Sequence, residues 1–343
     1  MSIEPIQLSG APGSPYTRKM LAVLRYRHLP YRFLIRNSPA ANAMPVPPVQ
    51  LLPTFYLPDA AGTLQAVVDS TPIIRRLERE HTGRAVLPPD PVLGFIDDLL
   101  EDYADEWLTK PMFHYRWHYA ADIERAGEVL PRWRNITGSD EVMAKMKEQF
   151  SQRQISRLGV VGSSAITAPV IEGSYKRFLA ALDAHLHHHP FLMGARPGAS
   201  DFATYGQLTQ LTHFDPTPMA LTLAQSPRVF AWVDLVDDLS GLTVDESAGW
   251  ISRDAIPDTL RALLAEVGRT YVPVMLANAR ALAAGASRVE LDLDGLPWVQ
   301  QPFPYQGKCV VWLRDAWDRL GEGDRRTLAP LLEQTGCLPL VTR

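Results

Sequence analysis

The sequence predicts an α/β domain at the N-terminus, an all-helical domain after it, and a mixed α/β extension at the C-terminus. Three observations indicate this division. Short alternating runs and one strong helical pattern fill the start of the chain, the composition turns helical after a proline-containing linker at residues 81–91, and an alternating segment returns near residue 290. We therefore expect domains at residues 1–82 and 92–245 and an extension at residues 250–343.

Composition and charge exclude several classes of protein. A chain of 343 residues, 46% hydrophobic and 21% charged, is typical of a soluble globular protein with two or more domains. The net charge of -4 gives no basic footprint for nucleic acid, and no apolar run is long enough to cross a membrane. The N-terminus lacks the pattern of a signal peptide, and Cys309 and Cys337 do not make a disulfide framework. We expect a cytoplasmic protein that binds neither nucleic acid nor membrane.

Strands and helices alternate in the N-terminal domain. The expected elements are a strand at 6–8, a helix at 15–28, a strand at 31–35, a proline-rich loop with at most one helical turn at 37–48, strands at 54–57 and 64–68, and a helix that starts at residue 70 or 71. The first strand–helix–strand unit should be right-handed with parallel strands, and the last two strands should form a hairpin.

The stretch from Ser14 to Lys19 begins the first helix. Ser14 is a good N-cap, and Pro15 suits the first helical position, where no N–H is needed. Apolar residues then form one stripe, with the basic residues, Lys19 and Arg27 among them, mostly off it. A hydroxyl at a helix start lies in a field that favours anions. Two interpretations stay open here, a binding site for a thiolate and a helix cap with no further role.

Three short motifs in this order resemble the N-terminal, thioredoxin-like domain of bacterial-type glutathione S-transferases. They are Ser14-Pro15-Tyr16 at the first helix, Leu52-Pro53 before the third strand, and Asp69-Ser70 before the third helix. In that family the proline is cis and the backbone before it meets the cysteinyl part of glutathione, while the acidic–serine pair binds the γ-glutamyl end. Free N–H groups at a helix start can bind its carboxylate, and an acidic side chain can bind its ammonium group.

The resemblance implies a site with glutathione as co-substrate and no metal. Ser14 would be the catalytic, thiol-facing residue, and the glutathione-binding residues would be Leu52, Pro53, Asp69 and Ser70. Ser9, at the end of the first strand, is the other candidate for the thiol-facing position. We prefer Ser14 because it directly precedes Pro15, so the hydroxyl and the helix dipole act at one point.

Each motif also has a plainer interpretation. Pro53 can simply start a strand, Ser70 can simply cap a helix, and Asp69 can simply lie near a positive helix end. The main departure from the family is the proline-rich stretch at residues 39–48. It contains no basic residue that would hold the glycyl end of glutathione.

Residues 92–121 read as a long helix with an aromatic middle. In relatives the corresponding helix lines the pocket for the hydrophobic substrate. The resemblance therefore implies a pocket with Tyr16, Phe113 and Trp117, although aromatic residues at helical spacing can equally be core.

Three polar residues of the same stretch could share one helix face. His114, His118 and Asp122 are spaced at i, i+4 and i+8, which would suit a metal ion. No further ligand context supports this alternative, and we expect no metal.

A second landmark of the family lies at residues 191–202. There, a Ser or Thr three residues before an Asp caps the buried helix of the C-terminal domain by reciprocal hydrogen bonds. Asp201 matches the acidic position, but Gly198 stands in the Ser/Thr position. The resemblance covers residues 3 to about 245. It implies a thioredoxin-like α/β domain and an all-α transferase-type domain, and it leaves the mixed α/β extension unmatched.

Helical and strand patterns continue in the extension. We expect a helix at 256–284 kinked by Pro273, a hairpin at 289–299 that packs on a helix, and helices at 308–320 and 324–334.

Two functions are consistent with these observations. The first is a glutathione transferase-like enzyme that activates the thiol of glutathione for attack on a small apolar electrophile and forms a homodimer, as relatives mostly do. The second is a non-catalytic binding or scaffold protein with the same fold, because fold does not fix function.

Overall fold

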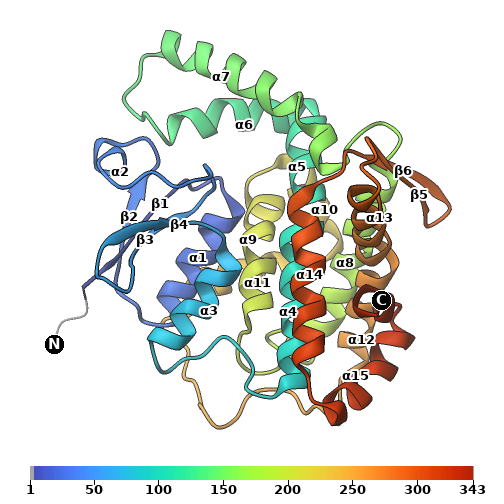
Figure 1. The fold of residues 1–343 in the computed structure, drawn as a ribbon. Helices are drawn as coiled ribbons and strands as arrows, with labels where there is room; N and C mark the ends of the chain where they lie inside the picture. The colour runs from blue at the N-terminus through green and yellow to red at the C-terminus, as the bar shows by residue number, and fades with distance from the viewer. Residues whose placement is uncertain (1–3, 343) are drawn as a thin grey trace.

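A four-stranded mixed sheet forms the N-terminal part of the computed structural model, which describes residues 4–342 (Figure 1). The strand order is β2-β1-β3-β4, with β1 and β2 parallel and the other neighbours antiparallel. The elements are β1 (Ile6–Gly10), α1 (Pro15–Tyr26), β2 (Tyr31–Ile35), α2 (Pro39–Asn42), β3 (Thr54–Pro58), β4 (Leu64–Val67) and α3 (Ser70–Glu80). Leu8 and Phe55 are fully buried against α1 and α3. This is the expected thioredoxin-like arrangement, including the single helical turn in the proline-rich loop.

Helices alone make up the next part of the chain. They are α4 (Pro91–Tyr103), the π-helical η1 (Ala104–Leu108), α5 (Thr109–His118), α6 (Ala120–Arg132), α7 (Asp140–Ile155), the 3₁₀ turn η2 (Leu158–Val161), α8 (Ala168–Leu186), α9 (Ala199–His213), α10 (Pro216–Gln225) and α11 (Pro227–Asp237). The helix expected at 92–121 is therefore interrupted by a π segment and ends where Tyr119 adopts extended backbone angles. Among residues 4–342, no helix has both the length and the apolar character needed to cross a membrane.

The extension folds back over the helical part. Its elements are α12 (Asp258–Glu266), the π-helical η3 (Val267–Tyr271), α13 (Val272–Ala283), β5 (Val289–Leu293), β6 (Leu296–Gln300), α14 (Pro304–Arg319), α15 (Glu322–Gln334) and α16 (Leu338–Val341). The predicted hairpin is present and packs on α13. Pro273 lies in the first turn of α13, directly after the π segment. In Figure 1, α14 runs alongside α4, and both α14 and α15 contact it.

Lys19 of α1 and Arg27, the C-cap of that helix, lie inside the protein, although the sequence predicts both off the apolar stripe. Lys19 is 1% exposed and Arg27 is 5% exposed. Each is paired with carboxylates, Arg27 with Glu78 at 2.8 Å and Lys19 with two acidic residues of the α4–η1 segment. Pairing is what makes a buried charge tolerable, so the apolar stripe alone did not define the buried face.

The start of α9 is capped from another helix. Asp201 accepts from the Gly198 N–H at 2.8 Å, as in the expected capping arrangement, but Gly198 has no side chain to reciprocate. Asp97 of α4 supplies the missing acceptor, with hydrogen bonds from the N–H groups of Ala199 at 3.2 Å and Ser200 at 3.1 Å. A Cβ at Gly198 would overlap this carboxylate. Glycine is therefore the residue that the cap from α4 requires.

Ionisable groups anchor the extension to the π segment. Lys110 is 2% exposed, donates to the Gln300 side chain at 3.1 Å, and lies over the Trp298 ring at 5.4 Å. Burial lowers the pKa of Lys110 to about 8. Burial also raises the pKa of Glu106 to about 8 and that of Asp102 to about 7.

Substitution of Gly198 by alanine tests the cap. Gly198→Ala should lower the free energy of unfolding by about 1–3 kcal/mol, because the new methyl group overlaps the Asp97 carboxylate, which is held by its own hydrogen bonds. Gly241→Ala is the control, since open space surrounds Gly241. Chemical denaturation of both variants measures the difference. Equal stability of the two would contradict the packing described here.

Stability should also fall as the pH rises from about 4 to 8. Glu106 has a folded-state pKa of about 8, far above its unfolded value. Its stabilising contribution is therefore complete below the unfolded pKa and is lost as the pH rises through the folded one. Glu106→Gln should flatten the decline by up to about 1.4 kcal/mol per pH unit. Chemical denaturation at several pH values, with exposed Glu141→Gln as control, checks this; an unchanged slope in Glu106→Gln would refute it.

Candidate functional site

Three predicted motifs meet at one edge of the sheet. The pairing of Ser9 with Thr54 places Pro53 beside the end of β1, where the chain turns towards Ser14. The Leu52–Pro53 peptide bond is cis, as the resemblance implied. Ser70 begins α3, and its hydroxyl accepts from Lys19 of α1 at 3.1 Å. The starts of α1 and α3 and the turn before β3 are therefore held together.

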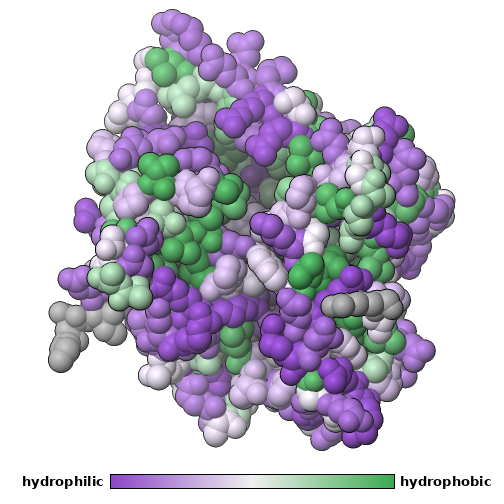
Figure 2. Space-filling model, viewed as in Figure 1, coloured by the Kyte–Doolittle hydropathy of each residue, from purple (hydrophilic) through white to green (hydrophobic). Residues whose placement is uncertain are grey.

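Ser14 is the N-cap of α1. Its hydroxyl oxygen accepts from the Thr17 N–H at 3.3 Å, which leaves the hydroxyl proton free to be donated. The neighbouring Gly13 carbonyl accepts from Arg116 of α5 at 3.2 Å, and a Cβ on Gly13 would meet Leu130 of α6. The turn before α1 therefore faces α5 and α6, and Figure 2 shows the molecule hollowed in this area, above the centre of the view. The structure establishes the capping role, and a thiol-facing role stays a prediction.

The acidic–serine pair is in an unusual local conformation. Asp69 has a φ of 84°, in the left-handed region that non-glycine residues rarely occupy, and it directly precedes the first residue of α3. Burial raises the pKa of Asp69. Its Oδ2 accepts from the hydroxyl of Tyr305, in the first turn of α14, at 2.8 Å. The extension thus reaches the position where the resemblance places the γ-glutamyl end of glutathione.

A buried ammonium group lies beneath this pair. Lys19 Nζ is 2.7 Å from Glu101 and 2.6 Å from Asp105. Burial acts to raise the pKa of Glu101, but Arg75 and Lys19 outweigh it and lower that pKa to about 2. Burial raises the pKa of Asp105 to about 6, although Lys19 opposes the shift. The ionised Glu101 therefore balances the charge of Lys19 next to Ser70.

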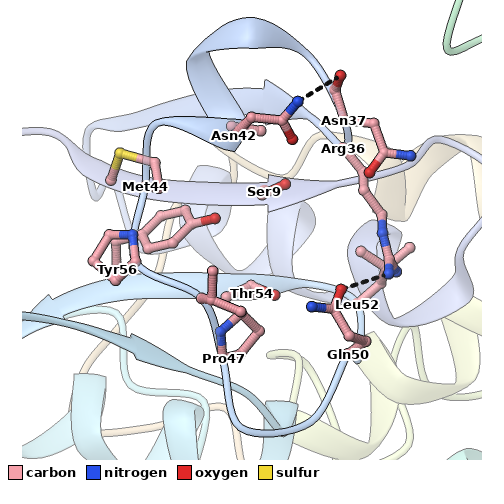
Figure 3. Close-up of a pocket in the computed structure, with 13 residues that line it drawn as sticks. Ser9, Arg36, Asn37, Asn42, Met44, Pro47, Gln50, Leu52, Thr54 and Tyr56 are labelled. Carbon is pink, nitrogen blue, oxygen red and sulfur yellow. Dashed lines mark hydrogen bonds between the residues drawn. The ribbon is translucent and has the colours of Figure 1, made fainter.

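A cavity of about 130 Å³ lies under the proline-rich loop (Figure 3). Ser9, Leu52 and Arg36 contribute to its lining, and Figure 3 shows the Arg36 guanidinium beside Gln50, with a hydrogen bond of 2.9 Å between them. Sequence reasoning searched the proline-rich loop for a basic residue and missed Arg36, which comes directly after β2. The sequence does contain a signal for this residue, because Arg36 is a basic residue directly after the end of β2, the strand that pairs with β1.

The three aromatic residues expected in a substrate pocket, Tyr16, Phe113 and Trp117, differ in their burial and in the elements that they contact. The Tyr16 hydroxyl donates to the Asp105 carbonyl at 2.8 Å, so it ties α1 to the π segment. Trp117 is 2% exposed and packs against Phe150 of α7, with ring centroids 5.8 Å apart. Phe113 is partly exposed and packs against both the main core and a smaller cluster formed by Trp117, Ala126 and Phe214. Of the three, Phe113 has the placement that best suits contact with a ligand.

The polar residues at i, i+4 and i+8 do not meet at one point: the His114 and His118 rings stack with centroids 4.6 Å apart, but Asp122 contacts another helix. His114 lies between Ser163, 2.8 Å from Nδ1, and Glu172, 3.3 Å from Nε2, and is a buried link between α5 and α8. Asp122 instead accepts from the backbone of Thr217 at 3.0 Å. Within the described residues 4–342, no group of three His, Cys, Asp or Glu side chains could hold a metal ion.

Family models match two parts of the chain, the first of which carries Ser14, Leu52-Pro53 and Asp69-Ser70. The model of the glutathione S-transferase N-terminal domain matches residues 8–85, and that of the C-terminal domain matches residues 149–235. No curated protein matches the chain.

Solved structures of bacterial glutathione transferases are similar at low identity. One from Methylobacterium radiotolerans, in complex with glutathione sulfonate, is 20% identical, with 68% of this chain and 90% of that chain covered and a TM-score of 0.40. One from Rhodospirillum rubrum is 19% identical, with 73% and 98% covered and a TM-score of 0.43. With both domain models matched in order, residues 8–85 and 149–235 are identified as the N- and C-terminal domains of the glutathione S-transferase family.

Proposed function

We propose that this protein binds glutathione at the sheet edge and activates its thiol for attack on a small apolar electrophile. The observation that carries the proposal is the joint placement of the α1 start, the cis Leu52–Pro53 turn and the Asp69-Ser70 pair at one edge. Each motif alone has a structural explanation, but glutathione needs all three together.

Each end of glutathione has a partner of opposite charge in this proposal. The N–H groups at the start of α3 take the γ-glutamyl carboxylate, and Asp69 takes the ammonium group. The Leu52 backbone meets the cysteinyl part. Arg36 lines the cavity together with Leu52, and its guanidinium is the cation that we assign to the glycyl carboxylate.

Activation of the thiol is assigned to Ser14. A free thiol has a pKa of roughly 8.5, so only a minority is thiolate at neutral pH. A donated hydroxyl proton and the positive end of α1 both stabilise the thiolate. The thiol proton passes to solvent, and the thiolate attacks a carbon of an electrophile that enters beside Phe113 from the hollow between α1, α5 and α6. As the carbon–sulfur bond forms, either a leaving group departs with its electron pair or, in an addition, the π bond breaks and the product takes a proton from water.

A non-catalytic binding or scaffold role is the second candidate. The Tyr305 contact with Asp69 favours it, because part of the proposed glutathione site is already occupied by the chain itself. A cytoplasmic location and a homodimer remain proposals drawn from the composition and the family. A symmetric pair would need a surface other than the side of α4 that α14 and α15 contact.

Loss of the Asp69 charge tests the glutathione site. Asp69→Asn keeps a residue type that tolerates positive φ but removes the charge that faces the ammonium group, so the affinity for glutathione should fall about two- to fivefold, because Tyr305 already holds one carboxylate oxygen. Titration calorimetry measures this, with exposed Asp254→Asn as control. Equal affinities of wild type and Asp69→Asn would reject the placement, and no binding by any of the proteins would favour the scaffold role.

Substitution of Ser14 separates capping from catalysis. Ser14→Ala should raise the pKa of the bound thiol and slow conjugation at neutral pH, while glutathione affinity changes less. Loss of the cap should also cost about 1 kcal/mol of stability. Ser139→Ala is the matched control, because Ser139 caps α7 through the same kind of bond, to the Val142 N–H.

The measurements for Ser14 are the pH–rate profile and the thiolate absorbance of the binary complex. A shifted profile in Ser14→Ala alone supports the thiol-facing role. If both variants lose stability and neither profile moves, Ser14 is a cap and nothing more.

A further inference from the structure

Tyr305 reaches the proposed γ-glutamyl site from outside both matched domains. It lies in the first turn of α14, 236 positions along the chain from Asp69. Its hydroxyl donates to Asp69 Oδ2 at 2.8 Å. The residue is part of the extension that the family models leave unmatched.

Several contacts fix the start of α14 in this place. Phe303 and Asn278 of α13 exchange two hydrogen bonds, of 2.7 and 3.0 Å, directly before the helix begins. Cys309, one turn after Tyr305, is 1% exposed in the core. Trp312 packs edge-on against the Tyr305 ring, with centroids 6.1 Å apart. The Tyr305 hydroxyl is therefore held against Asp69 by the fold.

This hydroxyl occupies one oxygen of Asp69, Oδ2, before any ligand arrives. Lys19, the nearby cation, is paired with Glu101 and Asp105 and forms no ion pair with Asp69. An arriving ammonium group would have to share the carboxylate with Tyr305 or displace its hydroxyl. Either way it gains less than it would from a carboxylate with both oxygens free.

We propose that Tyr305 competes with the ammonium group of glutathione for Asp69 and thereby sets the specificity of the site. The proposal rests on the glutathione site proposed above. The amino group of the γ-glutamyl end then contributes little to the affinity of the wild-type protein for glutathione. Glutathione and an analogue that lacks only this amino group should then bind with similar affinities.

The experiment compares these two ligands by titration calorimetry. The probes are glutathione and glutaryl-cysteinylglycine, its deaminated analogue. The proteins are the wild type, Tyr305→Phe and Tyr119→Phe. Tyr119 is a matched control, because its hydroxyl also donates to a carboxylate, that of Glu172, at the far end of α5.

Tyr305→Phe should bind glutathione about fivefold more tightly than wild type, the equivalent of one ordinary hydrogen bond of roughly 1 kcal/mol. Its affinity for the deaminated analogue should not change, and neither affinity should change in Tyr119→Phe. If the amino group contributes equally to the binding affinity in wild type and in Tyr305→Phe, the proposed competition is wrong. The proposed glutathione site is not contradicted by that result.

Wild type alone also tests the proposal if Tyr305→Phe fails to fold. An amino-group contribution below about fivefold supports competition, and a larger one, expected for an unhindered charge-assisted bond, overturns it. Absence of binding by both ligands to every protein would overturn the glutathione site and the inference together.

Discussion

The buried ammonium group of Lys19 joins the N-terminal domain to the α4–η1 segment of the helical part. It bonds Ser70 at the start of α3 and pairs with Glu101 and Asp105 on the α4–η1 segment, so three helices converge on one nitrogen. Removal of Lys19 would leave the buried Glu101 and Asp105 carboxylates without this cation, and breaking a buried ion pair in this way typically costs several kcal/mol. Because Ser70 begins the proposed γ-glutamyl site, the geometry of that site depends on the same interaction that joins these elements.

The acidic residues of the α4–η1 segment explain what the extension covers. Glu106 and Asp102 are held with pKa values raised by burial, and the groups that cover them come from residues beyond the family match. Tyr271 donates to Asp102, and Gln306 donates to the Glu106 carbonyl at 3.5 Å. Without η3 and α14, which carry Tyr271 and Gln306, the two carboxylates would face water and their pKa values would be close to the ordinary ones. The extension thus converts a surface of α4 into interior.

Local sequence signals predicted the local structure and failed where distant residues decide the outcome. The strands, the one-turn helix in the proline-rich loop and the hairpin follow from alternation, proline and the Asp294-Gly295 turn, all of which act over a few residues. The burial of Lys19 depends on carboxylates 82 and 86 positions away, and the Gly198 cap depends on Asp97 of another helix. Short motifs likewise predicted which site residues meet, but no local signal connects Tyr305 with Asp69.

The location of the extension bears on how this transferase fold differs from its relatives. The N-terminal fold brings the three motifs to one sheet edge, and it therefore places a helix start next to an acidic side chain. What the site then prefers depends on which group satisfies Asp69. Here α14, anchored through Asn278 and Cys309, places a neutral hydroxyl there. A chain can therefore keep the positions of a glutathione site and alter its selectivity through residues that lie outside the domains that define the family.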